Sequence, residues 1–132
     1  MQMRKLNRGF TLVEIMIVVA IIALLAAIAV PGFLRARKRS QGTTIKNDLR
    51  LIDAAVDQYA IEYNLGTGTV TSAQVTIYLK PGTRLANTMT DILGNAYASS
   101  FTLGSLPSVP TASFAALSDV CDANFFSPYP TS

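Results

Sequence analysis

The stretch that decides the fold is Ile15–Val30, IMIVVAIIALLAAIAV, a run of sixteen apolar residues. No charge lies between Glu14 and Arg35. Because an α-helix rises about 1.5 Å per residue, a helix over residues 10–34 is about 37 Å long and crosses a hydrocarbon core of about 30 Å. The alternative is a buried core helix, but a chain of 132 residues cannot cover such a helix on every side. We therefore predict a transmembrane helix over residues 10–34.

A cleaved secretory signal is a second interpretation of this run. Basic residues at positions 4, 5 and 8 precede it, and Ala27-Ile28-Ala29 offers a signal-peptidase site. Glu14 at the edge of the run and Pro31 just beyond that site argue against it. An uncleaved anchor fits better, although basic residues flank both ends and the positive-inside rule does not orient the helix.

The scarce residue types exclude most catalytic chemistry. The chain has no His and one Cys, Cys121, so it has no Ser-His-Asp or Cys-His site and no intrachain disulfide. No pair of carboxylates or glycine-rich loop forms a recognisable catalytic motif. We predict a protein that is not an enzyme, with no catalytic residue, metal or cofactor. Calcium is a lesser alternative, because Asp119 and Asp122 are too few for a site of about six to eight oxygens.

The positive charge does not indicate a nucleic-acid surface. The net charge is +3, and four basic residues follow the apolar run, namely Arg35, Arg37, Lys38 and Arg39. No aromatic residue that could stack on bases is interleaved with them. We interpret them as a solvated collar at the membrane boundary. Alternatively, they contact lipid head groups or acids of a neighbouring subunit.

The helix is predicted to continue beyond the collar as an amphipathic segment over residues 35–63. The polar stretch Gln41-Gly42-Thr43-Thr44 could interrupt it, but apolar residues then return at helical spacing, at Ile45, Leu49, Ile52, Val56, Tyr59 and Tyr63. Pro31 lacks an N–H group and its ring clashes with the carbonyl of Ala27, so we expect a kink or a locally unwound turn at Pro31-Gly32. The result is one long, bent helix.

Residues 64–132 are predicted to form a small globular head on this helix. The fold class is therefore α+β, with the long helix packed on a head that carries a short antiparallel sheet. Residues 73–79 fit a helix or a strand, and Gly94-Asn95 fits a turn that leads into a strand over residues 97–103. We expect a short helix over residues 113–120 and an extended aromatic tail over residues 125–130.

The order of residues before the apolar run resembles the processing signature of type IV prepilins and pseudopilins, on the segment Arg8-Gly9-Phe10-Thr11-Leu12-Val13-Glu14. The resemblance implies that a prepilin peptidase cuts after Gly9 and methylates the new amine of Phe10, so that residues 1–9 are a cleaved leader. It also implies that Glu14 neutralises the N-terminal amine of a neighbouring subunit. On physical grounds alone, the helix dipole explains Glu14 equally well.

A second likeness lies in the head. Residues 91–97, Asp-Ile-Leu-Gly-Asn-Ala-Tyr, are similar to the Asp-Pro-Trp-Gly-Asn-Pro-Tyr stretch of major pseudopilins of type II secretion. The lone Cys121 excludes the disulfide-closed loop of many type IV pilins. The resemblance therefore implies a subunit of a periplasmic pseudopilus that serves protein secretion.

The resemblance also implies partners and a location. The subunit would polymerise with its own copies and related pilin-like subunits on an inner-membrane assembly platform. Its helix would lie in the inner-membrane bilayer, as a single pass, and its head in the periplasm, before it enters a periplasmic or surface filament. Two alternatives stay open: a major or minor type IV pilus subunit, and a single-pass membrane-anchored binding module that does not polymerise.

Overall fold

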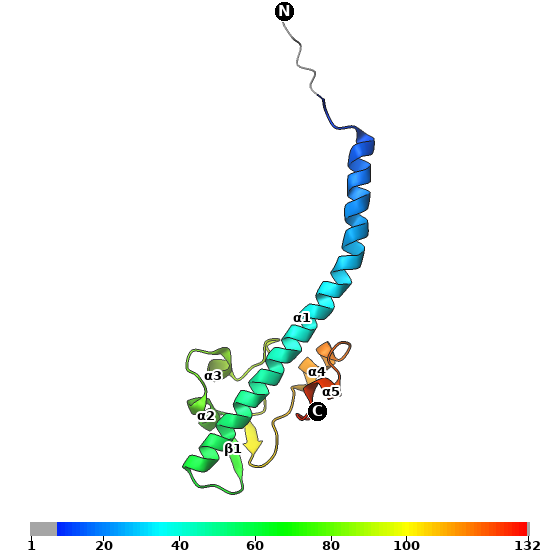
Figure 1. Ribbon diagram of the computed structural model, residues 1–132. Helices are drawn as coiled ribbons and strands as arrows, with labels where there is room; N and C mark the ends of the chain where they lie inside the picture. Colours follow the sequence, from blue (N-terminus) through cyan, green and yellow to red (C-terminus); the bar gives the residue numbers. More distant parts are fainter. Residues whose placement is uncertain (1–7, 132) are drawn as a thin grey trace, which may run out of the picture. The chain divides into compact units, whose positions relative to one another are not determined.

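The computed structural model describes residues 8–131. One long helix, α1 (Leu12–Glu62), begins shortly after Gly9-Phe10 (Figure 1). The chain divides into two compact units, residues 1–35 and residues 36–132. Most of the predicted leader lies outside the described residues. Arg8 and Gly9, which are described, are non-helical and exposed.

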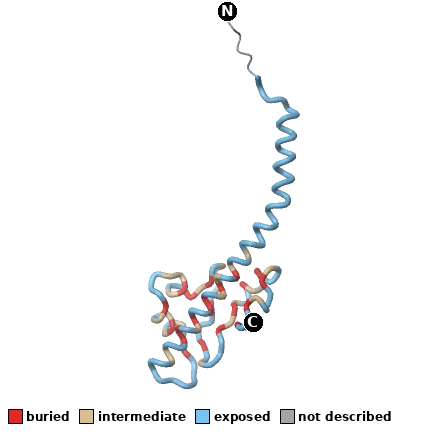
Figure 2. Tube along the Cα trace, in the orientation of Figure 1, coloured by how far each residue is buried: buried red, intermediate tan, exposed pale blue. Residues whose placement is uncertain are grey.

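The first unit consists of the apolar part of α1. Residues 12–34 are exposed on every face of the helix, as the uniform pale blue of Figure 2 shows. By length and composition, the helix is long and apolar enough to cross a membrane. Residues 27–32 are all helical, so the locally unwound turn does not form here. Pro31 removes a single backbone donor, and the kink at Pro31-Gly32 stays a prediction.

The polar stretch at residues 41–44 does not interrupt α1, which corrects that part of the sequence interpretation. The hydroxyl of Thr43 donates to the carbonyl of Arg39 at 3.0 Å, and the hydroxyl of Thr44 to that of Ser40 at 3.1 Å. These bonds to carbonyls four residues earlier satisfy both hydroxyls inside the helix.

The core of the second unit is built on the amphipathic part of α1. Ile45, Leu49 and Ile52 have no exposed surface, and Val56 is 5% exposed. In Figure 1 the short helices α2 (Ser72–Val75) and α3 (Arg84–Thr88) lie on one side of this segment, with α4 (Thr111–Leu117) and α5 (Ala123–Phe126) on the other. The first four members of the predicted apolar stripe are thus buried, and Tyr59 is half-buried against the core. The last member, Tyr63, lies just after the end of α1 and is 58% exposed.

The sheet is antiparallel and has two strands among the described residues. β1 (Thr69–Thr71) pairs with β2 (Ser100–Thr102), and the buried Val70 lies opposite Phe101. Within residues 73–79 the chain is helical as far as Tyr78, because α2 is followed by the 3-10 helix η1 (Thr76–Tyr78), and Leu79 is extended. The side chain of Gln74 reaches back to accept from the backbone N–H of Thr71 at 2.9 Å, which favours the helix over a strand.

The C-terminal region differs in part from the prediction. Helix α4 confirms a short helix near residues 113–120, although it begins earlier and ends at Leu117. The tail is not wholly extended, because Phe125 and Phe126 belong to α5. The side chain of Asp122 caps this helix by accepting from the N–H of Phe125 at 2.9 Å. Phe126 is fully buried and Tyr129 is 7% exposed, so the tail packs these rings into the core.

Candidate functional site

The segment that the processing signature singles out lies just before α1. Residues 8–11 are non-helical, and all of them are exposed. A Cβ atom added at Gly9 would meet nothing within 4 Å, and Gly9 is not among the glycines with positive φ. The described fold therefore does not itself require a glycine at this position. A requirement for glycine there has to come from outside the described fold.

Thr11 and Glu14 form a reciprocal cap at the start of α1. The backbone N–H of Thr11 donates to Oε2 of Glu14 at 3.0 Å, and the N–H of Glu14 donates to Oγ1 of Thr11 at 3.3 Å. This is a capping box, which satisfies two N–H groups that the first turn leaves without partners. Thr-x-x-Glu before an apolar run is the signature of this cap, but the cap was not predicted from it.

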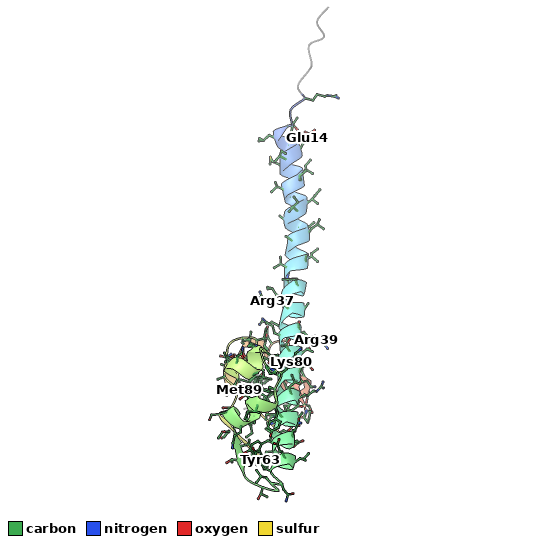
Figure 3. All side chains as sticks on the ribbon, turned by 90° about the vertical axis from the view of Figure 1, so that its left-hand side faces the viewer. Glu14, Arg37, Arg39, Tyr63, Lys80 and Met89 are labelled. Carbon is green, nitrogen blue, oxygen red and sulfur yellow. The ribbon has the colours of Figure 1, made fainter. Side chains whose placement is uncertain are left out.

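Glu14 keeps capacity to bind a cation while it caps the helix. Figure 3 shows its side chain at the first turn, and the residue is exposed. Within residues 8–131, its carboxylate accepts a hydrogen bond from Thr11 alone. A carboxylate offers about four acceptor positions, so most of them stay available. The cap and a contact with an outside ammonium group are therefore compatible.

The basic collar is divided between two environments. Lys38 pairs with Asp119, with Nζ at 2.8 Å from Oδ2, and the guanidinium of Arg39 lies 6.0 Å from the ring centroid of Phe125. Arg35 and Arg37 are exposed, and so is Arg39 despite its contact with the ring. Lys38 and Arg39, two of the four basic residues of the collar, thus contact the C-terminal region. The spacing of residues in the sequence did not predict these contacts. Figure 3 labels Arg37 and Arg39 on the helix.

Gly42 is the glycine on which the head packs most closely. A Cβ atom added there would lie 2.7 Å from Sγ of Cys121 and 3.0 Å from a ring carbon of Phe125. Cys121 is fully buried, and burial raises the pKa of its thiol. Gly42 therefore lets the segment that holds Cys121 and α5 approach the helix.

We expect Gly42→Ala to destabilise the head. Overpacking of this kind costs about 1–3 kcal/mol, partly offset by the roughly 1 kcal/mol that alanine gains over glycine in a helix. Urea titration of the full chain in detergent micelles measures the expected fall in the free energy of unfolding. Gly32→Ala is the matched control, because a Cβ atom there meets nothing within 4 Å. Equal stabilities of the two variants would contradict the close contact.

A buried carboxylate joins three distant parts of the head. Asp48 of α1 is 8% exposed and accepts from Nη2 of Arg84 in an ion pair, and from the hydroxyl of Tyr97 at 3.1 Å. Burial and the charge of Asp48 raise the pKa of the Tyr97 hydroxyl well above its usual range. This network connects α1 with α3 and with the segment before β2.

The raised pKa of Tyr97 predicts a loss of stability at high pH. An unfolded tyrosine ionises near pH 10, whereas folded Tyr97 stays protonated, so the folded state binds one more proton above that pH. The contribution of Tyr97 to the free energy of unfolding is fully present below about pH 10. Above about pH 10, the free energy of unfolding falls by about 1.4 kcal/mol per pH unit. Urea titrations from pH 8 to 11 should show this slope, reduced in Tyr97→Phe. Identical slopes would refute the assignment.

The second likeness noted in the head corresponds to a turn organised by one buried residue. Asp91 is 1% exposed, and its Oδ1 accepts from the N–H groups of Leu93 and Asn95, each at 2.9 Å. Its other oxygen accepts from the hydroxyl of Ser113 in α4. Gly94 has a φ of 88°, as the predicted turn requires. Among the described residues, no group of three or more His, Cys, Asp or Glu is placed to hold a metal ion.

The described chain is an exposed apolar helix, capped at its start by Thr11 and Glu14, that continues into a small head. Residues 4–30 match the family model described as the prokaryotic N-terminal methylation motif. The type IV major pilin protein PilA of Myxococcus xanthus is 48% identical over 56 residues, which are 42% of this chain and 26% of that protein. Type II secretion system core protein G of Pseudomonas aeruginosa is 41% identical over 59 residues, 45% of this chain and 42% of that protein.

A third relative, the type IV wide pilus major component PilA4 of Thermus thermophilus, is 44% identical over 57 residues. The chain spans less than half the length of these relatives. No solved structure gives a significant match. The resemblance inferred from the sequence is confirmed. The chain carries the N-terminal methylation motif and has homologues among type IV pilins and the type II secretion core protein G.

Proposed function

We propose that the chain is a pilin-like structural subunit without enzymatic activity. It is processed between Gly9 and Phe10 and polymerised into a periplasmic pseudopilus of a type II secretion system. The observation that carries this proposal is the exposure of residues 12–34 on all faces of α1. An apolar surface of this size has to be shielded from water. Lipid shields it before assembly, and neighbouring helices shield it afterwards.

The residues around the cleavage site support this function. Gly9 meets no constraint in the described fold, which fits a glycine that a peptidase selects. Removal of residues 1–9 takes three basic residues away and leaves eight basic and eight acidic ones, so the mature chain is formally neutral. It also creates an ammonium group at Phe10, for which Glu14 of a neighbouring subunit is the counter-ion. Methylation of that amine keeps its charge.

The proposed subunit occupies two places in turn. The segment over residues 10–34 anchors it in the inner membrane as a single pass, with the head in the periplasm, and the assembly platform then adds it to a filament of its own copies and related subunits. The short head, the lone Cys121 and the turn at Asp91 favour a pseudopilus. A type IV pilus is the second candidate, favoured by the relatives that are named as pilus components.

Mass spectrometry of the chain, with and without prepilin peptidase, tests the processing step. We expect a mature chain that starts at Phe10 and carries one methyl group on its amine. Gly9→Val should stay uncut, because a side chain there blocks the approach of the peptidase while the described fold tolerates it. A chain that still starts at Met1 would support the anchored binding module instead. A chain that starts at Val30 would support a cleaved signal peptide.

Deletion of the gene separates the two filament candidates. Loss of protein secretion without loss of surface filaments would support the pseudopilus. Loss of surface filaments with normal secretion would support the pilus.

A further inference from the structure

The cap on α1 determines where the helix starts relative to the proposed cleavage site. The N–H of Ile15 donates to the carbonyl of Thr11 at 3.4 Å, which is a helical backbone bond. The donor one residue earlier, the N–H of Glu14, is held by the hydroxyl of Thr11 at 3.3 Å. In a longer helix, that N–H group would bond to the carbonyl of Phe10.

Loss of the Thr11 hydroxyl removes the cap that sets the start of α1 at Leu12. The N–H of Glu14 is then available to the carbonyl of Phe10, and the next bond of the same kind would bring the carbonyl of Gly9 into the helix. That carbonyl belongs to the peptide bond to be cut. A helical backbone has to open before a peptidase can bind it, so an extended helix slows cleavage.

We propose that Thr11 is a positioning residue for processing. Its hydroxyl, together with the carboxylate of Glu14, fixes the start of α1 at Leu12 and keeps the Gly9–Phe10 bond outside the helix. The inference rests on the proposed function, namely cleavage at that bond. Thr11 acts through the cap and does not touch the reacting atoms. The reaction consumes one water: its oxygen completes the carboxylate of Gly9, and the nitrogen of Phe10 becomes the free amine.

Initial cleavage rates of the full chain by purified prepilin peptidase in detergent micelles test the inference. Thr11→Val keeps the shape of the side chain but lacks the hydroxyl, and we expect its rate to fall about fivefold, as for loss of an N-cap of typical strength. Thr11→Ser and Thr11→Asn, which differ in shape but both cap helices, should be cut within about twofold of the wild-type rate. Glu14→Gln should behave like them, because glutamine keeps the acceptor of a capping box.

A structural readout separates capping from recognition of the Thr11 side chain by the peptidase. Backbone chemical shifts in the same micelles should place the helix start at Leu12 in the wild type and the capping variants, and earlier in Thr11→Val. Rapid cleavage of Thr11→Val, or slow cleavage with an unchanged helix start, would overturn the inference. In either case, a wild-type chain cut after Gly9 leaves the proposed function standing. A wild-type chain that is never cut there overturns both.

Discussion

A chain that carries Glu14→Gln is expected to be processed normally and to fail in filament assembly. Glutamine keeps an acceptor for the N–H of Thr11, so the cap on α1 and the cleavage site stay in place. It lacks the negative charge that the ammonium group of a neighbouring Phe10 needs. Removing one partner of a buried ion pair costs about 3–5 kcal/mol, because the other charge is left uncompensated. Each 1.4 kcal/mol is a factor of ten, so we expect at least about a hundredfold loss of assembled subunit.

Two measurements test this prediction. Quantitative immunoblots of sheared or overexpressed filaments measure the assembled subunit, and mass spectrometry of the membrane-bound pool measures the processed chain. Thr11→Val is the complementary control, because it weakens the cap and keeps the charge. We expect equal amounts of mature Glu14→Gln and wild-type chain in the membrane. Filaments should form from the wild type and from the Thr11→Val chains that are processed, but not from Glu14→Gln. Normal filaments in Glu14→Gln would show that the carboxylate serves the helix cap and not assembly.

The sequence predicted the features that depend on neighbouring residues. The apolar run over residues 15–30 and the order of Gly9, Phe10 and Glu14 are local patterns, and each predicts a structure or a function without knowledge of the rest of the chain. The cap between Thr11 and Glu14 is equally local and was open to prediction from its spacing. The stripe from Ile45 to Val56 was predicted for the same reason, and it is buried.

The features that the sequence did not predict depend on residues far apart in the chain. Gly42 was noted only as part of a polar stretch that could interrupt the helix, because its close contact with Cys121 joins positions 79 residues apart. Asp48 is one of several acids on α1, and nothing in its spacing marks it as the one that Arg84 contacts. Such pairings follow from how the loops fold back, which a periodic pattern does not encode.

Asp48→Ala should cause the largest loss of stability of any single substitution in the polar network of the head. The carboxylate receives Nη2 of Arg84 and the hydroxyl of Tyr97, and only 11% of its side chain is exposed. Alanine leaves the guanidinium without its counter-ion and the buried tyrosine without its acceptor. Breaking a buried pair in this way costs about 3–5 kcal/mol, a large part of the roughly 5–15 kcal/mol that keeps a domain folded.

The free energy of unfolding in urea gives the size of this loss, with Asp57→Ala as the control on an exposed position of the same helix. The control should change stability by less than about 0.5 kcal/mol. A double variant, Asp48→Leu with Arg84→Met, replaces both charges by apolar side chains of similar size and should recover much of the loss. Nη1 of Arg84 is already buried without a hydrogen-bond partner among the described residues, which adds to the expected recovery. Equal losses in Asp48→Ala and the double variant would show that the cavity, and not the unpaired charge, destabilises the head.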